Sequence, residues 1–387
     1  MGNRLFTLDA MRGIAAVVVV YYHSAVVTDV ACFQAPCNVR HGFLAVDMFF
    51  ALSGFVLSHT YDERFRNGLT AWGFMQNRIV RLMPIYWLGM AVALPLAGWE
   101  AVKGLQSVDG LVDTVLLNAA VLPSPVAAPY PYLIALLRPA WSLFFELWVA
   151  NLIFALFWRA LRGAGLAAVI GTASVGVVIG TLRYGSLDMG PVWDTFAGGF
   201  PRVLFSFFLG VAVRRLAARA APPRLPSPLV VGITLATFFL PVPHGWDVAF
   251  QLGCVTLAYP LLIYAGAGAT EKRVRLAVLL GDASYALYLI HMPLLDVWER
   301  GMRKGGVAPS PAAAALFVMA AFLLAVLVDR QYDRRARKAL ARLLGLAGAR
   351  RPRHGAVPVP VPVAVTRTPA MLPVTAGGPA PAAGPAA

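Results

Sequence analysis

Residues 8–28 read LDAMRGIAAVVVVYYHSAVVT, an apolar run in which Asp9, Arg12 and His23 are the acidic, basic and imidazole side chains. About 20 predominantly apolar residues are enough for a helix to cross the hydrocarbon core of a bilayer. A cleaved signal peptide would be free of such polar groups in its apolar part and would be followed by a small-residue cleavage site, which is missing here. We therefore expect this run to form a membrane-spanning helix of the mature protein.

The rest of the chain shares the apolar character of this first run. Of its 387 residues, 59% are hydrophobic and 13% are charged, and the mean hydropathy is +0.69. Soluble domains contain about 25% charged residues. Apolar runs of spanning length recur and predict an all-α fold, a polytopic membrane helical bundle with about ten transmembrane helices. The predicted spans are 8–28, 44–61, 80–97, 141–158, 166–182, 199–213, 228–241, 248–266, 277–297 and 311–328.

The net charge of +15 comes mainly from arginines that lie between these apolar runs. Such a distribution excludes nucleic-acid binding, and the positive-inside rule assigns the basic loops to the cytoplasm. We expect an integral protein of the bacterial inner membrane, with both termini in the cytoplasm and the loop 29–42 outside. The basic residues that decide this topology include Arg4, Arg12, Arg64, Arg66, Arg78, Arg81, Arg159, Arg162, Arg214, Arg215, Arg219, Arg224, Lys272, Arg273, Arg275 and the run 330–342.

A further apolar stretch, 108–137, is interrupted by Pro123, Pro125, Pro129 and Pro131. The loop charges agree with one another only if this stretch adds no net crossing. We therefore predict a re-entrant or membrane-lining segment on the outer side, which a membrane protein tolerates where the segment lines a cavity.

The composition changes near the C-terminus, where the chain becomes rich in Pro and Ala. Prolines at 358, 360 and 362 rule out a spanning helix in the apolar stretch 357–365. We expect a membrane domain over 1–345 and a disordered cytoplasmic tail over 346–387.

Cys32 and Cys37 lie in the loop predicted to be outside, as a disulfide or as two free thiols. Cys254 is expected to be a small buried side chain.

Ionisable side chains are costly inside a bilayer, so those within spans are functional candidates. Asp9 and Arg12 lie three residues apart and can form a structural ion pair on one helix face. His23 and Asp47 flank the loop 29–42 at similar depth, where a carboxylate beside an imidazole makes a general base. A hydrogen-bonded core histidine is the alternative. The candidates are Asp9, Arg12, His23, Asp47, Glu146, Asp282 and His291.

Glu146 and His291 fall in the outer halves of their predicted spans, while the opposite mouth of the bundle is rich in arginine. A guanidinium group donates hydrogen bonds in pairs and suits phosphates. A basic inner mouth with an acid–base cluster beyond it fits a donor with a phosphate head and a reactive tail, such as a coenzyme A thioester. Alternatively, the arginines only determine topology. No metal-ligand spacing stands out, and no metal is expected.

Five blocks of the sequence resemble the acyltransferase-3 family of integral-membrane O-acyltransferases, in the family's order. These blocks are residues 8–13 (LDAMRG) followed by His23, 46–55 (VDMFFALSGF), 78–84 (RIVRLMP), 141–146 (WSLFFE) and 284–291 (SYALYLIH). The resemblance implies transfer of an acetyl, succinyl or similar acyl group from acyl-CoA to a hydroxyl. The acceptor would be a glycan, a lipid-linked sugar or a small molecule, as in O-acetylation during polysaccharide modification.

The resemblance also implies that His23 is the essential base, while Arg78 and Arg81 form the family's R-x-x-R motif. These two arginines, together with Arg12, would hold the phosphates of CoA. Asp47 is the first choice as the orienting partner of the base, and Glu146 and His291 are the alternatives. The departures from the family pattern are Ala10 in place of glycine, Leu147 where many members have a second acid, and Asp329 without a Glu-x-Pro context.

Two other classes of function compete with acyl transfer. A transporter or flippase for a saccharide or lipid would perform no chemistry, and it would show discontinuous helices and inverted halves. The two halves of this sequence have no evident matching pattern. A membrane scaffold would not need an acid–base cluster inside the bilayer.

Overall fold

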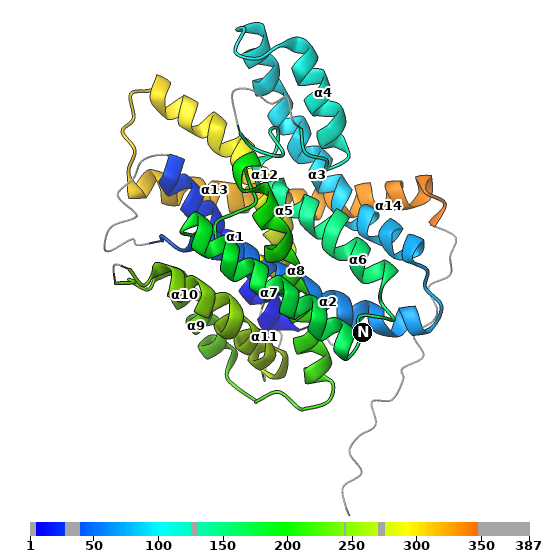
Figure 1. Cartoon of the computed structure of the whole chain (residues 1–387). Helices are drawn as coiled ribbons and strands as arrows, with labels where there is room; N and C mark the ends of the chain where they lie inside the picture. Colours follow the sequence, from blue (N-terminus) through cyan, green and yellow to red (C-terminus); the bar gives the residue numbers. More distant parts are fainter. Residues whose placement is uncertain (1–4, 28–38, 125–130, 244, 270–274, 347–387) are drawn as a thin grey trace, which may run out of the picture. The chain divides into compact units, whose positions relative to one another are not determined.

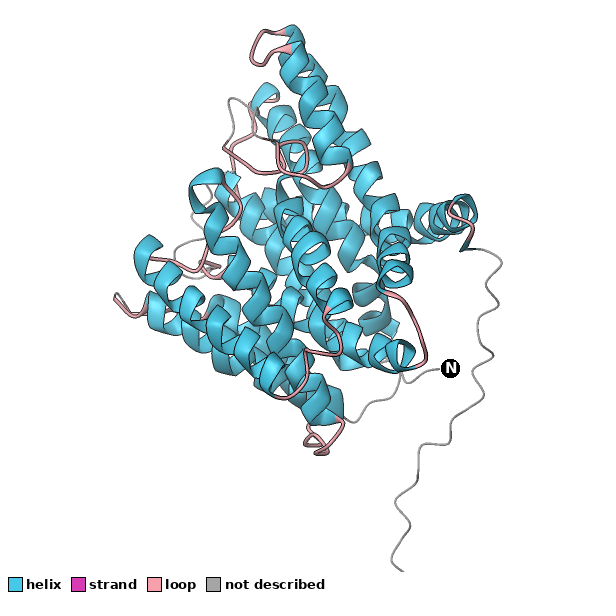
Figure 2. Ribbon diagram, turned by 45° about the vertical axis from the view of Figure 1, so that its right-hand side comes forward, coloured by secondary structure: helices cyan, strands magenta, loops and turns pink. Residues whose placement is uncertain are grey.

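The computed structural model describes residues 5–27, 39–124, 131–243, 245–269 and 275–346. Within these ranges the regular elements are helices, and the only β contact is an isolated bridge between Tyr132 and Val192. Figure 2 shows this all-helical composition. The predicted tail beyond residue 346 and the pair Cys32 and Cys37 lie outside the described residues. Cys254 is buried, as predicted.

Eight helical segments of the described chain are long and apolar enough to cross a membrane. They contain α2 (Ala45–Arg66), α3 (Ala71–Val102), α5 and α6 (Trp141–Phe144 and Asn151–Leu156), α7 (Ala164–Tyr184), α8 (Phe196–Ala217), α10 and α11 (Asp247–Gly253 and Tyr259–Gly268), α12 (Arg275–Lys304), and α13 with α14 (Pro311–Val328 and Arg334–Leu343). The other two predicted spans coincide with α1 (Phe6–Val27) and the shorter α9 (Ser227–Phe239). The predicted all-α polytopic membrane fold is confirmed (Figure 1).

The stretch 108–137 contains one helix, α4 (Val108–Ala119), of 12 residues. At 1.5 Å per residue this helix is about 18 Å long, short of the roughly 30 Å hydrocarbon core. It packs back on α3, where the Tyr86 hydroxyl donates to the Asn118 carbonyl at 2.5 Å. The Asn118 side chain in turn bonds the backbone of Leu122 and Leu136. Helix α4 is therefore too short to cross by itself, and its placement on the outer side stays a prediction.

Helices α2 and α8 touch through glycine. A Cβ atom on Gly54 would lie 1.9 Å from the Phe207 carbonyl oxygen, and one on Gly210 would lie 1.9 Å from the Ala51 carbonyl oxygen. Small residues let two membrane helices approach to backbone contact, where dispersion replaces the hydrophobic effect as the source of stability. Any larger side chain at either glycine would separate α2 from α8.

Helices α1 and α12 form a second glycine-mediated pair. A Cβ atom on Gly13 would lie 2.4 Å from Cβ of Leu280, and one on Gly281 would lie 2.7 Å from Cβ of Asp9. This contact sets the spacing between the two helices that carry the histidines described below.

Topology can be tested with reporter fusions, and the result depends on α9, the shortest of the ten expected spans. If all ten cross, a periplasm-active reporter fused after Leu343 should be inactive, and one fused after Asn38 should be active. The loop arginines require this arrangement. Strong periplasmic activity after Leu343 would mean an odd number of crossings, which would either remove α9 from the membrane count or add the stretch 108–137 to it.

Candidate active site

A pair of histidines lies between α1 and α12. Nδ1 of His23 is 3.1 Å from Nε2 of His291, and the ring centroids are 5.1 Å apart. His291 is fully buried, whereas His23 is partly exposed. The close packing of α1 on α12 brings together two residues that are 268 positions apart in the chain.

The hydrogen bonds of this pair determine its tautomers. Nδ1 of His291 is 3.1 Å from the Leu287 carbonyl oxygen, which can only accept, so the ring proton of neutral His291 is on Nδ1. Nε2 of His291 then has a lone pair and accepts from Nδ1–H of His23. Neutral His23 is left with an unprotonated Nε2, which is the nitrogen that can take a proton from a substrate.

Asp47, predicted to orient His23, contacts α8 instead. Nη2 of Arg202 donates to Asp47 at 2.8 Å, Nε of Arg202 lies 3.1 Å from both carboxylate oxygens, and Ser206 donates at 3.3 Å. Among the described residues, no hydrogen bond or ion pair joins Asp47 to His23. Similar depth along two helices does not determine the direction in which a side chain points, and the Asp47 carboxylate bonds to α8. Within the described part of the chain, the side chain that is hydrogen-bonded to His23 is His291.

Arg202 is the residue that the sequence analysis missed. It is completely buried, as is Asp47, and it also donates to the carbonyl oxygens of Met189 and Phe43. A signal for it was present, because a guanidinium inside the predicted span 199–213 requires a carboxylate at the same depth.

A cavity of about 260 Å³ lies among α1, α2, α3, the α5–α6 segment and α12. Its lining includes all three arginines proposed from the sequence, Arg12, Arg78 and Arg81, together with Glu146. Tyr288 also lines it, and the Tyr288 ring centroid is 6.1 Å from that of His291. Tyr288 therefore borders both the cationic cavity and the histidine pair.

Glu146 lies with Arg78 rather than with the histidines. Nη2 of Arg78 donates to Glu146 at 2.8 Å, and the Ser53 hydroxyl donates to it at 2.6 Å. Glu146 is in a π-helical turn, Phe145–Ala150, and such turns are frequent at functional sites. The predicted span began at residue 80, which placed Arg78 outside the bundle and apart from Glu146. Helix α3 begins at Ala71, so Arg78 is about two turns inside it.

The other two arginines are also held by carboxylates. Arg12 donates to Asp9 at 2.9 Å, which confirms the predicted ion pair, and to the Ser284 hydroxyl at 3.1 Å. Arg81 lies 3.6 Å from Asp333. The buried Nε of Arg78 has no hydrogen-bond partner among the described residues. A buried N–H of a cation that faces a cavity calls for an acceptor, and an anionic ligand would supply one.

The fold and this site define a polytopic membrane protein with a histidine pair near a cavity that three arginines line. The chain belongs to the acyltransferase-3 family, whose model, an acyltransferase domain, matches residues 5–330. It is therefore a membrane acyltransferase.

Three curated proteins are similar to the chain. The acyltransferase MdmB of Streptomyces mycarofaciens is 28% identical over 84% of this chain and 88% of its own length. The exopolysaccharide production protein ExoZ of Rhizobium meliloti (strain 1021) is 28% identical over 79% of this chain and 95% of its own. Protein 2 in the picA locus of Rhizobium radiobacter is 34% identical over 40% of this chain and 82% of its own. No solved structure matches.

Proposed function

We propose that this protein is an O-acyltransferase of the bacterial inner membrane that moves an acetyl, succinyl or similar group from acyl-CoA to a hydroxyl. The observation that carries the proposal is the His23–His291 pair, in which Nε2 of His23 is free to accept a proton. A membrane scaffold has no use for such a base, and although proton-coupled transporters also use intramembrane histidines, the similarity to acyltransferases favours chemistry over transport.

Acyl-CoA is the proposed donor, entering from the cytoplasm. Its phosphates would contact Arg78, Arg81 and Arg12, and the unpartnered Nε–H of Arg78 supplies a donor for them. The pantetheine arm would follow the cavity toward Tyr288. Arg12 and His23 are 11 residues apart on α1, about 16 Å along the helix, so an extended donor is needed to connect them.

In the proposed reaction, Nε2 of His23 removes the proton of the acceptor hydroxyl. The resulting oxygen attacks the thioester carbonyl, the C–S bond breaks, and the CoA thiolate takes the proton from His23. His291 keeps Nδ1–H of His23 hydrogen-bonded throughout, so the imidazolium forms without losing its partner. A route through an acyl-histidine, in which Nε2 attacks the thioester first, uses the same nitrogen and stays open.

The acceptor is proposed to be a glycan or a lipid-linked sugar, with a small molecule as the alternative. Support comes from the similarity to a protein of exopolysaccharide production over most of both chains. Incubating purified protein with acetyl-CoA or succinyl-CoA and candidate acceptors tests the reaction through release of free CoA. Acceptor-dependent release with a mass gain of one acyl group on the acceptor is expected. Transport of the acceptor without any acyl transfer would support the flippase alternative.

The proposed donor site predicts the effect of conservative replacements. Arg78→Lys and Arg81→Lys should raise the KM for acyl-CoA by roughly tenfold or more and leave the acceptor KM nearly unchanged, because a charge-assisted hydrogen bond contributes about 1.5–3 kcal/mol. Lysine keeps the charge but loses the paired donors. The matched control is Arg183→Lys, at the exposed end of α7. If the KM for acyl-CoA is unchanged in both variants, these arginines determine only the membrane topology and do not bind the donor.

A further inference from the structure

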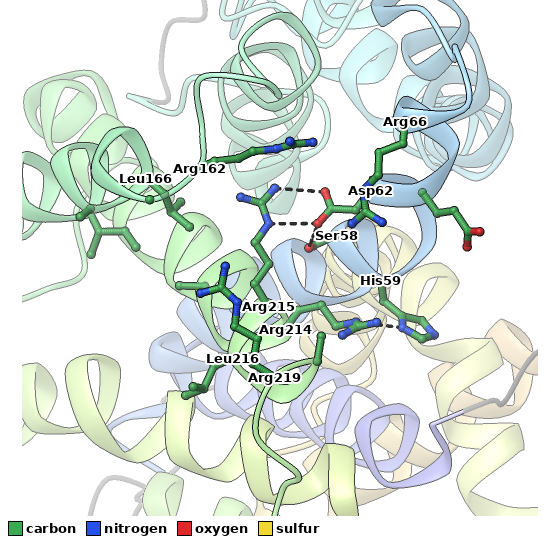
Figure 3. Close-up of a pocket in the computed structure, with 16 residues that line it drawn as sticks. Ser58, His59, Asp62, Arg66, Arg162, Leu166, Arg214, Arg215, Leu216 and Arg219 are labelled. Atoms are coloured by element: carbon green, nitrogen blue, oxygen red, sulfur yellow. Dashed lines mark hydrogen bonds and ion pairs between the residues drawn. The ribbon is translucent and has the colours of Figure 1, made fainter. Parts of the chain in front are cut away.

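A second pocket, of about 650 Å³, lies where α2 and α8 end and α7 begins. Among the described residues it shares no lining side chain with the catalytic cavity. It is strongly cationic, with five arginines against two carboxylates, those of Asp62 and Glu63. Figure 3 shows these side chains gathered around one space, with Arg66, Arg162 and Arg215 around Asp62. The arginines are Arg66, Arg162, Arg214, Arg215 and Arg219.

Part of this cluster is fixed in place by internal contacts. Asp62 accepts from Nε and Nη2 of Arg215 at 3.0 and 3.1 Å, and from the Trp158 indole at 2.9 Å. Arg215 also donates to the Leu161 carbonyl oxygen. Arg214 donates to Nδ1 of His59 at 3.0 Å, which leaves the ring proton of neutral His59 on Nε2. The positive-inside rule explains why arginines lie at these helix ends, but it does not explain why their side chains line one pocket.

The remaining arginines are available for a ligand. Within the described parts of the chain, Arg66, Arg162 and Arg219 form no ion pair with a carboxylate, and all three are exposed. Arg162 lies 4.2 Å above the Trp158 ring, which holds the guanidinium at the pocket rim. Three uncompensated guanidinium groups around a preformed pocket fit a phosphate, whose oxygens accept several paired hydrogen bonds.

The apolar wall of the pocket indicates where such a phosphate would come from. Leu166, Ala167 and Ile170 form this wall on α7. The same helix then exposes an apolar surface, with Val175, Ile179 and Leu182 at 58%, 60% and 68% exposure. A headgroup in the pocket could therefore keep its acyl chains on α7 without leaving the bilayer. Basic pockets between helices on the cytoplasmic side are typical of acidic lipid headgroups.

We propose that this pocket binds the phosphate headgroup of an anionic phospholipid from the cytoplasmic leaflet. The site is independent of acyl transfer and would exist whatever the acceptor is. A soluble phosphate ester such as CoA presents the same chemistry to the arginines, but it lacks the chains that the apolar wall of α7 accommodates.

The test uses the full-length protein in detergent and measures lipid binding by native mass spectrometry. Short-chain phosphatidylglycerol should bind, and phosphatidylcholine should bind far more weakly. Arg162→Gln with Arg219→Gln should weaken phosphatidylglycerol binding roughly 25-fold, because each arginine near an anionic surface contributes about a factor of five. Neither residue is in an internal ion pair, so folding should be retained, and Arg183→Gln is the matched control.

The soluble arm of the same experiment adds CoA and inorganic phosphate as competitors. Phosphatidylglycerol binding that persists at saturating CoA and is lost in the double variant supports a lipid site. Displacement of the lipid by CoA in proportion to its concentration would overturn the lipid assignment in favour of a soluble phosphate ester. Unchanged lipid binding in a folded double variant would overturn the site itself.

Discussion

His23→Ala is expected to lower the rate of acyl transfer by about 10²- to 10⁴-fold, the usual effect of losing a general base. Nε2 of His23 is the nitrogen that the hydrogen-bond chain from Leu287 through His291 leaves unprotonated. Because His23 is partly exposed, we expect the His23→Ala variant to fold normally. Release of free CoA, measured after size-exclusion chromatography in detergent, gives the rate of the folded protein.

Two further histidine variants sharpen this test. His291→Ala should lower the rate less than His23→Ala, because in the proposed reaction His291 bonds to His23 and does not take the substrate proton. His41→Gln is the control, since burial lowers the pKa of the His41 imidazole, and a neutral amide replaces a neutral ring. A folded His23→Ala protein with near-normal transfer would move the role of the base to His291.

The second large effect is on folding. Asp47→Asn or Arg202→Met should each destabilise the protein by about 3–5 kcal/mol, because each removes one partner of a fully buried ion pair; without Asp47, Arg202 keeps only the exposed carboxylate of Asp188, 3.6 Å away. The double variant should recover most of this loss, since the buried pair is then neutral and the remaining carboxylate of Asp188 is exposed to solvent. The stability of the two single variants and the double variant is measured as the fraction of protein that stays monodisperse after heating in detergent.

The double variant also separates a structural role from a catalytic one. We expect it to transfer acyl groups at close to the normal rate, because Asp47 contacts α8 and not His23. A stable double variant without activity would return Asp47 to the reaction, as the sequence analysis predicted.

The spans could be predicted because each one is a long apolar run between basic loops, and these signals do not depend on how the helices pack. Pairing within the site does depend on packing. His23, Asp47 and His291 were all identified as candidates, but which two meet is decided by the direction each side chain takes around its helix. Arg202 then determines where Asp47 points, and it was missed although a buried cation always needs a partner.

The position of Arg78 could have been predicted more closely from a local signal. The Thr70 hydroxyl accepts from the backbone N–H of Gly73 and caps α3, so the helix begins nine residues before the apolar run does. A threonine at the N-cap position, which accepts from a backbone N–H in the first turn, indicates in a sequence where a helix begins. With that start, Arg78 falls inside the bundle, and its contact with Glu146 becomes an expected one.

The two glycine-mediated helix pairs, α1 with α12 and α2 with α8, carry different parts of the candidate site. His23 and His291 are on α1 and α12, a pair that packs closely at Gly13 and Gly281 and that we expect to move as one body. Helix α2 also lines the cavity that contains Arg12, Arg78 and Arg81, and α2 packs just as closely on α8, so that these two helices form a second body. Shear between these two bodies would widen or narrow the passage for substrate and product. We expect such breathing to leave the distance between the two imidazoles unchanged, so that admission of substrate and alignment for reaction are governed by separate contacts.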